Sequence, residues 1–377
     1  MTGMRHIVSL TALDVSVAIV LDGLDSAEAV QFVQSWSRCG ARAVSEIPRG
    51  STVIRARLRM PGQGQVQDED ARDLTADSYR ELADRLSGLV TLRAIDARRQ
   101  NLLMFHAGGV ADLRTGNVIA FIGPSGRGKT TASIALGKTF GYVTDETLAV
   151  SDDLGVLAYA KPLSVKQAAP ERWKDQFGPA ALGLAAVPAR ALRLVRIVLL
   201  DRQSDYAEGV RPLVRPVPLA SVIAELVPQI SFLAERARPL HRLRSTIDRC
   251  GGLQQVTYGE ATSLTDVFRA LFAEAEAEQD GLSGDNPTVF FEAEYDDAVL
   301  DDESLIVLRQ GTVRVLAGIA PTLLELAAVP VSFDDLVRGV VDIHGMPGRA
   351  DARVLVGAAV DELVASGLLR ASTPRAS

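Results

Sequence analysis

The chain has 377 residues, of which 47% are hydrophobic and only 5% aromatic, and its formal net charge is −7. This length accommodates two or three domains, whose cores must be rich in Leu, Val and Ala. The acidic balance excludes nucleic acid and anionic membranes as expected partners, and the two cysteines are too few for a disulfide framework or a zinc site.

The N-terminal sequence lacks the features of a secretory signal or a membrane span. The apolar stretch at residues 7–21 is interrupted by Asp14 and followed by Asp22. No run reaches the roughly 18 apolar residues that a membrane-spanning helix needs. We therefore expect a cytoplasmic protein.

Residues 1–100 have the pattern of an α+β region without a motif for chemistry. Apolar periodicity predicts strands at 16–21 and 52–58 and helices at 26–36 and 74–86. Ser26 is a suitable N-cap for the first helix. We expect Phe32 and Trp36 to be core residues rather than ligand contacts.

A phosphate-binding motif begins directly after the next predicted strand. Residues 118–122 form an apolar, β-branched run, and residues 131–136 have helical character. Between them, Gly-Pro-Ser-Gly-Arg-Gly-Lys-Thr at 123–130 fills every position of the Walker A pattern. A chance glycine-rich turn is the alternative, but the flanking strand and helix are those that the motif requires.

The chemistry of such a loop favours a nucleoside triphosphate. Backbone N–H groups and the positive end of the helix dipole converge on one point, which suits a polyphosphate. We expect Lys129 to reach the β- and γ-phosphates and the Thr130 hydroxyl to hold Mg²⁺. The residues predicted to contact ATP are Gly123, Ser125, Gly126, Arg127, Gly128, Lys129, Thr130 and Thr131.

Three further features accompany the loop in the sequence. His106 precedes it by about one hairpin, the pair Asp145-Glu146 lies where the chain returns as the next strand, and Lys161 and Lys166 form a basic loop. Ligands gather at the carboxyl ends of strands in open α/β sheets, so Asp145 is expected to face the phosphates. There it would take a proton from an attacking hydroxyl or help to hold Mg²⁺. A structural histidine, a turn cap and solvated lysines are the simpler alternatives.

The rest of the chain contains a clear linker. After a predicted strand at 192–200 and a helix at 219–226, an acidic helix end leads into a Gly/Ser/Asp/Pro-rich stretch. We therefore expect an α+β region at 1–100, a nucleotide-binding domain at 101–279, a linker at 280–287 and a separate domain at 288–377.

The last domain has the pattern of a small winged-helix-like module. Predicted strands at 305–309 and 312–316 flank a Gln-Gly turn, and helices follow at 321–328, 333–341 and 350–366, the second capped by Ser332. A DNA-binding winged helix is one interpretation. Residues 289–377 contain fourteen acidic and seven basic residues, however, and this balance repels a phosphate backbone.

The motifs around the phosphate loop resemble those of the HPr kinase/phosphorylase family and its HPr-kinase-like relatives. The resemblance covers about residues 105–271 and rests on His-Ala-Gly-Gly-Val at 106–110, the loop, Val-Thr-Asp-Glu at 143–146 and Lys-Pro-Leu-Ser at 161–164. It implies an α/β fold of the phosphoenolpyruvate-carboxykinase type. It also implies that Asp145 is the base that activates a serine hydroxyl, that Glu146 assists the metal and that His106 supports the site.

The chain differs from the family's motifs at two positions. The chain has Thr130-Thr131 where the family often has Ser-Glu, and Glu146 where the family has Asp. The downstream signature of the phosphorylase reaction is not found either. The resemblance therefore implies kinase activity alone, on a substrate other than HPr.

The C-terminal module resembles PqqD-like proteins, the peptide-recognition domains of ribosomal peptide modification systems. The matching features are Asp301-Asp302-Glu303, Gly318-Ile319, Phe333-Asp334-Asp335-Leu336 and the segment at 363–369. In that family a leader peptide adds a strand to the edge of the hairpin. A module that only caps the kinase domain or joins two copies into a homo-oligomer is the alternative.

The leading hypothesis is an ATP- and Mg²⁺-dependent kinase that phosphorylates a hydroxyl, with serine as the first choice, on a peptide or protein brought in by the C-terminal module. A nucleotide-binding scaffold or regulator without transfer activity is the second hypothesis. A small-molecule kinase with an accessory C-terminal domain is the third.

Overall fold

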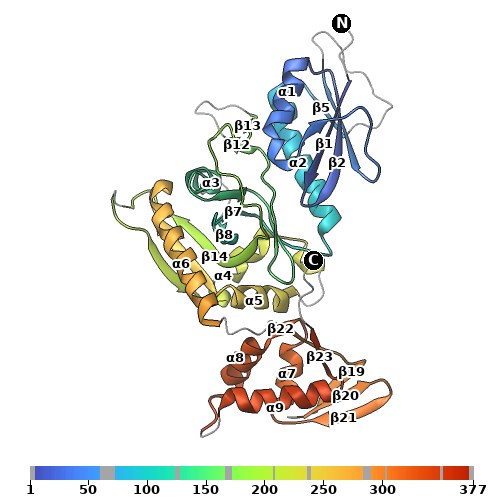
Figure 1. Cartoon of the computed structure of the whole chain (residues 1–377), viewed down its shortest axis with the longest axis vertical. Helices are drawn as coiled ribbons and strands as arrows, with labels where there is room; N and C mark the ends of the chain where they lie inside the picture. Colours follow the sequence, from blue (N-terminus) through green and yellow to red (C-terminus); the bar gives the residue numbers. More distant parts are fainter. Residues whose placement is uncertain are drawn as a thin grey trace. The chain divides into compact units, whose positions relative to one another are not determined.

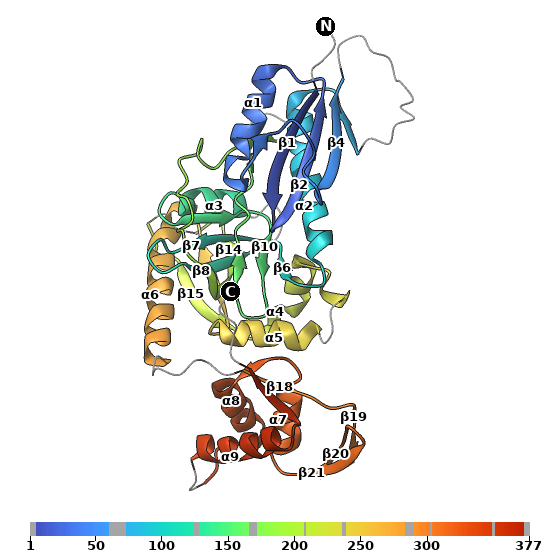
Figure 2. The same ribbon diagram turned by 45° about the vertical axis from the view of Figure 1, so that its right-hand side comes forward.

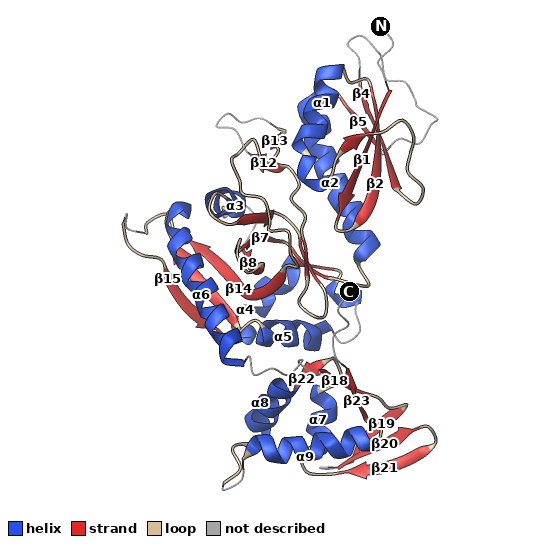
Figure 3. Cartoon of the chain, viewed as in Figure 1, coloured by secondary structure: helices blue, strands red, loops and turns tan. Residues whose placement is uncertain are grey.

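The computed structural model describes residues 5–59, 73–123, 128–165, 172–206, 209–235, 239–282, 290–301, 304–348 and 351–372. The chain contains helices as well as strands, and the strands form several sheets, which is consistent with the predicted α/β class (Figures 1 and 3). Two compact units are present, one made of Met1–Ala237 with Cys250–Glu276 and the other of Arg238–Arg249 with Ala277–Ser377. None of the described helices is both long and apolar enough to cross a bilayer.

The first unit begins with a five-stranded sheet of order β3-β1-β2-β4-β5. Its strands are β1 (Arg5–Ala12), β2 (Val15–Asp22), β3 (Arg42–Ala43), β4 (Thr52–Leu58) and β5 (Leu74–Ala76). Helices α1 (Ser26–Ser35) and α2 (Tyr79–Arg98) contribute to the core of this region (Figure 2). Phe32 and Trp36 are each 1% exposed, which confirms that they are core residues.

The cap of the first helix and the start of the second differ from the predicted ones. Asp25, not Ser26, caps α1. Its side chain accepts a hydrogen bond from the Glu28 amide, and its own amide donates one to the Glu28 carboxylate, which makes a capping box. Residues 74–76 form β5, and α2 begins only after its cap Ser78. The helix also continues past Gly88, because Val90 and further apolar residues extend its buried face.

A six-stranded sheet of order β15-β17-β14-β8-β7-β9 forms the centre of the unit. Its strands are β7 (Ala107–Ala111), β8 (Asn117–Ile122), β9 (Gly141–Thr144), β14 (Arg193–Arg202), β15 (Leu213–Val217) and β17 (Leu253–Tyr258). β8, β14 and β17 are parallel, and β9 runs in the same direction because β7 is antiparallel to both β8 and β9. The carboxyl ends of these four strands therefore meet at one edge.

Helices cover the central sheet on both faces. α3 (Lys129–Gly137) and α6 (Leu264–Leu282) share a core with one face, where the rings of Phe121 and Phe268 meet edge to face with centroids 5.7 Å apart. α4 (Leu219–Leu226) lies beside Ile122 and Leu199, which alternate with the residues of that core and so face the other side. This arrangement leaves the carboxyl edge for the loops.

Shorter elements complete the unit. A four-stranded sheet of order β11-β10-β6-β16 contains β6 (Leu103–Phe105), β10 (Leu148–Val150), β11 (Val156–Leu157) and β16 (Ile230–Ser231). β12 (Leu163–Val165) pairs with β13 (Asp175–Phe177). Single 3-10 turns are η1 (Ser37–Cys39), η2 (Val227–Gln229), η3 (Leu233–Glu235) and η4 (Ala261–Ser263).

The second unit combines α5 (Pro239–Arg249) with the C-terminal residues. Its two sheets have the orders β22-β18-β23 and β19-β20-β21. The strands are β18 (Phe290–Ala293), β19 (Asp297–Asp301), β20 (Ser304–Arg309), β21 (Thr312–Leu316), β22 (Val331–Ser332) and β23 (Leu369–Ser372), and the further helices are α7 (Ala320–Leu326), α8 (Phe333–His344) and α9 (Ala352–Ala365).

The predicted hairpin and the three predicted helices are present in this unit. Gln310 and Gly311 have φ of 46° and 76°, as a tight turn between β20 and β21 requires. Ser332 accepts a hydrogen bond from the Asp335 amide and so caps α8. The sequence did not predict β19, which adds a third strand to the hairpin.

Candidate active site

The described ends of the predicted phosphate loop, Gly123 and Gly128, lie at the carboxyl edge of the central sheet. β8 ends at Ile122, Gly123 follows, and α3 begins at Lys129, so the strand and the helix expected on either side of the loop are confirmed. Of the predicted ATP contacts, Ser125, Gly126 and Arg127 lie outside the described residues.

Gly128 and Lys129 make the start of α3 suitable for an anion. Gly128 is the N-cap and has a φ of 91°, a left-handed conformation that other residues adopt only with strain. Lys129 is buried, and its Nζ donates a hydrogen bond of 2.6 Å to the Gly123 carbonyl. Burial lowers the pKa of Lys129, and the nearby carboxylates of Asp145 and Glu146 oppose this shift only in part.

Asp145 lies beside the first turn of α3. It follows β9 directly and is 6% exposed. The Thr130 hydroxyl donates a hydrogen bond of 3.3 Å to its Oδ2, and the Tyr142 hydroxyl donates one of 3.1 Å to its Oδ1. Two predicted site residues, Thr130 and Asp145, are therefore in direct contact.

Lys161 is the positive partner of the acidic pair. Its Nζ lies 2.9 Å from Glu146 Oε2 and 3.6 Å from Asp145 Oδ1, and its side chain is 1% exposed. Burial alone would lower the pKa of Lys161, but the two carboxylates outweigh burial and raise it. Burial would likewise raise the pKa of Glu146, and Lys161 reverses this effect so that the value is lowered.

The sequence predicts a basic loop that could reach phosphate, with solvated lysines as the alternative, and Lys161 is instead buried beside two carboxylates. Lys166 lies outside the described residues, and Lys161 is directed into the protein instead of toward solvent. The physical reason is charge compensation, because two neighbouring carboxylates with little exposure require a cation close by. The contact joins residues fifteen or more positions apart and could not be read from local sequence.

His106 lies between β6 and β7, next to the acidic pair. Its backbone amide donates to the Gln229 carbonyl at 2.6 Å, and the amide of Ala107 donates to the Glu146 carbonyl at 3.1 Å. Burial and the charge of Lys129 lower the pKa of His106 despite the two carboxylates, so the imidazole is neutral at neutral pH. Thr131, in contrast, is exposed on the first turn of α3.

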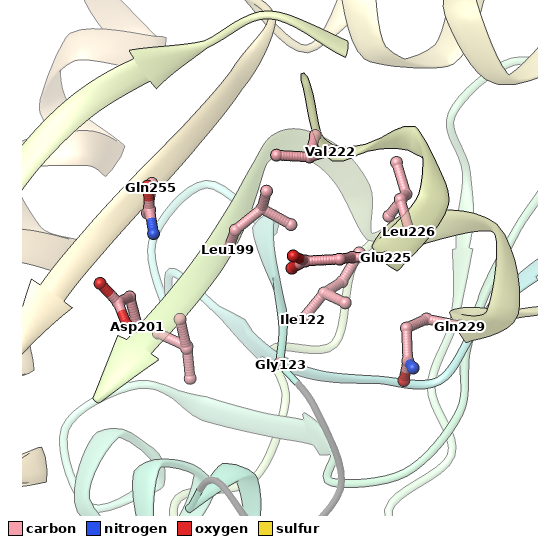
Figure 4. Close-up of a pocket in the computed structure, with 10 residues that line it drawn as sticks. Ile122, Gly123, Leu199, Asp201, Val222, Glu225, Leu226, Gln229 and Gln255 are labelled. Carbon is pink, nitrogen blue, oxygen red and sulfur yellow. The ribbon is translucent and has the colours of Figure 1, made fainter. Parts of the chain in front are cut away.

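A pocket of about 290 Å³ adjoins Gly123 on the α4 side of the sheet (Figure 4). Ile122 and Leu199 form its apolar floor, and the carboxylate of Glu225 is directed between them (Figure 4). Asp201, at the end of β14, also lines the pocket and accepts hydrogen bonds of 3.1 Å from Thr257 and Gln203.

Sequence reasoning missed Asp201, although a signal for it was present. The apolar run at 192–200 ends in this acidic residue, as the run before Asp145 does. The same rule about carboxyl ends of parallel strands therefore applies to both residues. Tyr142 had no comparable signal, because an aromatic residue in an apolar strand is usually a core residue.

The oxygen ligands at the site suit Mg²⁺ bound together with phosphates. Within the described parts of the chain, no group of three or more His, Cys, Asp and Glu residues is placed to hold a metal. Mg²⁺ requires less from the protein, since one or two carboxylates and the substrate phosphates usually complete its shell. The Thr130 hydroxyl and the Asp145 carboxylate are ligands of this kind.

Comparisons with known proteins find similar chains among the solved structures. No family model matches the chain, and no curated protein matches it. Among solved structures, the HPr(Ser) kinase/phosphatase from Coxiella burnetii is 13% identical, with a TM-score of 0.25, over 47% of this chain and 99% of that chain. It is only a weak structural neighbour, and the proposal below rests on the residues of the site.

Proposed function

We propose that this protein is an ATP-dependent kinase that transfers the γ-phosphoryl group to a hydroxyl, serine in the first instance, of a peptide or protein. The observation that carries the proposal is the contact at the carboxyl edge of the sheet. There the Thr130 hydroxyl of the phosphate-loop helix lies 3.3 Å from the carboxylate of Asp145. A phosphate-binding group and a proton acceptor are thus side by side, as hydroxyl phosphorylation requires.

The start of α3 would bind the triphosphate. Lys129 and the free backbone amides of the first turn would donate to phosphate oxygens. The ammonium group of Lys129 now bonds to the Gly123 carbonyl and can exchange this acceptor for a phosphate. A polyanion would also offset the effect of burial, which lowers the pKa of Lys129, and would favour its protonated form.

Thr130 would hold Mg²⁺ together with the phosphates, and Glu146, next to Asp145, would assist it. The bound ion would neutralise charge on the phosphates and help to orient them. The role of Glu146 is secondary, because Lys161 holds its carboxylate at 2.9 Å. Both residues supply oxygen ligands, which Mg²⁺ prefers.

Asp145 would act as the base. It would accept the proton of the attacking hydroxyl while the new O–P bond forms and the bond to the leaving ADP breaks. Hydrogen bonds from Tyr142 and Thr130 orient its two oxygens, so the carboxylate is held in place before substrate arrives. The neutral imidazole of His106 would support the phosphate side of the site without adding a second positive charge.

The C-terminal unit would recruit the peptide. β19, β20 and β21 place Val299, Ile306 and Val315 in one cross-strand row, and Leu308 and Val313 in the next. Four of these five side chains are at least 36% exposed, so the outer face of the sheet is apolar. An apolar sheet with a free edge strand suits a peptide that adds a further strand, as in the PqqD-like proteins that the sequence resembles.

A nucleotide-binding scaffold is the second candidate function. The exposed position next to Thr130 is Thr131, where the family resembled by the sequence often has a carboxylate, and Glu146 is paired with Lys161. Both features reduce the number of carboxylates available to a metal. A scaffold would bind ATP through the same loop and transfer no phosphate.

The test compares the full chain with Asp145→Asn and Lys129→Ala. ATP binding is measured by calorimetry in the presence of Mg²⁺, and transfer is measured from labelled ATP to a library of serine-containing peptides. We expect Asp145→Asn to retain ATP affinity and to lose at least about 100-fold in transfer. We expect Lys129→Ala to lose ATP binding. Equal transfer by Asp145→Asn would refute the proposed base, and ATP binding without transfer by the wild type would favour the scaffold.

A further inference from the structure

A second cavity lies beyond the ends of β14 and β17. Its volume is about 760 Å³, and its walls are the loop that follows β14, including Arg202 and Tyr206, and the chain around η4, including Gly259, Thr262 and Val267. If the phosphate loop binds ATP as proposed above, we infer that this cavity holds the ribose and the base of the nucleotide.

The order of the strands gives the direction in which the nucleotide extends. Asp145 follows β9, which lies on one side of β8, whereas β14 and β17 lie on the other side. The γ-phosphate must point to the base Asp145 for transfer. The α-phosphate and the nucleoside therefore extend to the opposite side, over the carboxyl ends of β14 and β17.

Gly128 connects the phosphate loop with this cavity. A Cβ atom placed on Gly128 would lie 3.6 Å from Arg202 Cδ and 3.7 Å from the Tyr258 hydroxyl. Arg202 is itself a wall of the cavity. Arg202 therefore lies next to Gly128, the cap of the phosphate-binding helix, and also lines the proposed nucleoside site.

Tyr258 is a donor without a partner at this junction. The residue is completely buried, and its hydroxyl oxygen has no hydrogen-bond partner in the described parts of the structure. Burial raises the pKa of Tyr258, which keeps the hydroxyl protonated. An oxygen of a ligand that passes Gly128 would accept the hydrogen bond that this group lacks.

The lining of the cavity suits a nucleoside. Tyr206, Val210 and Val267 offer aromatic and aliphatic surface for a base, while Thr262 and Asp266 offer polar groups for a ribose and for amino groups. The Tyr206 hydroxyl donates a hydrogen bond of 2.8 Å to the Arg211 carbonyl, which links two residues of the cavity wall. The volume lies within the range of about 300–1,000 Å³ that is usual for small-molecule sites.

The pocket beside α4 is a poorer candidate for the nucleotide. It is smaller, at about 290 Å³, and it contains the carboxylates of Asp201 and Glu225. Among the residues that line it in the described structure, none is Lys or Arg. A nucleotide would meet negative charge there without compensation.

The experiment separates the nucleoside from the phosphates. Calorimetry measures the binding of Mg-ATP and of Mg-tripolyphosphate to the wild type, to Thr262→Trp and to Thr139→Trp. Thr262 is an exposed residue on the wall of the cavity, and Thr139 is an equally small, exposed residue beyond the far end of α3. The indole at position 262 is expected to fill part of the cavity.

We expect Thr262→Trp to weaken ATP binding at least about tenfold and to change tripolyphosphate binding less than about twofold, because only the nucleoside is displaced. Thr139→Trp should change neither. Retained binding of tripolyphosphate also shows that the variant is folded. Unchanged ATP affinity in Thr262→Trp, an equal loss for both ligands, or a wild type that binds both ligands equally tightly would overturn the nucleoside site. A wild type that binds neither ligand would instead refute the proposed function.

Discussion

Lys161 compensates the charge of two neighbouring carboxylates, Asp145 and Glu146, in the candidate active site. Its Nζ is within 3.6 Å of both Asp145 and Glu146 and is shielded from water. Removing one partner of a buried ion pair leaves the other charge uncompensated. Lys161→Met is therefore expected to lower the free energy of unfolding by about 3 kcal/mol in urea denaturation.

The matched control for this change is Lys138→Met, at the exposed C-cap of α3. It should alter stability by less than about 0.5 kcal/mol. If Lys161→Met were as stable as this control, the ion pairs of Lys161 would contribute nothing to the fold.

Asp153 gives the turn between β10 and β11 a dependence on pH. A hydrogen bond from Ser151, together with the Gly155 amide and the charge of Arg193, lowers the pKa of Asp153 although burial opposes this shift. Because the folded value is the lower one, the carboxylate stabilises the fold above the unfolded pKa of 3.8, and this contribution is lost as the pH falls through the folded pKa.

Asp153→Asn is accordingly expected to melt at a lower temperature than the wild type at about pH 7, with a smaller difference at about pH 3. Thermal unfolding followed by circular dichroism at both pH values measures this. Asp205→Asn, on an exposed loop residue, serves as the control. If the melting temperatures of Asp153→Asn and the wild type differed equally at both pH values, the charge of Asp153 would not contribute to stability.

At the level of single elements, sequence patterns predicted those helices and strands that are made of consecutive residues. The strand and the helix on either side of the glycine-rich motif are local elements, so their sequence pattern was sufficient to predict both. Asp145 could be placed at the carboxyl edge of the sheet because it directly follows a strand. The contacts of Lys161 and of Tyr258 join distant segments, and only the folded chain brings them together.

Gly88 shows why a helix end can be predicted wrongly. A glycine is a weak signal for a helix terminus, since its cost inside a helix is only about 1 kcal/mol. The apolar face of α2 continues on both sides of Gly88, through Leu86 and Val90, and burial of this face outweighs the cost. A Cβ at position 88 would meet no atom within 4 Å.

Gly88→Ala is therefore expected to raise the free energy of unfolding by about 0.5–1 kcal/mol, because alanine restricts the unfolded chain more than glycine does. Gly128→Ala should lower it, since φ there is 91°. Urea denaturation of both variants tests this contrast. A destabilised Gly88→Ala protein would show that α2 is not a regular helix at this position.

At the scale of the whole molecule, the proposed function assigns catalysis and peptide recruitment to different units. Gly128, Asp145 and Lys161 belong to the first unit, and the exposed apolar sheet belongs to the second. Sequence patterns predicted the β20–β21 hairpin from its Gln-Gly turn. They did not predict β19, because its apolar segment is only three residues long and lies between Asp297 and Asp301.

Val315→Glu tests whether the exposed sheet of the second unit binds the peptide. Val315 is 67% exposed on β21, so a charge there costs little stability but should repel an apolar peptide segment. With a serine peptide that the wild type phosphorylates, we expect KM to rise at least about tenfold, with kcat and ATP affinity unchanged. Val30→Glu is the matched control, because Val30 is 54% exposed on α1 in the first unit. If both variants behaved alike, or if Val315→Glu changed kcat and not KM, the sheet would have no part in binding the peptide, and the first unit would select its substrate unaided.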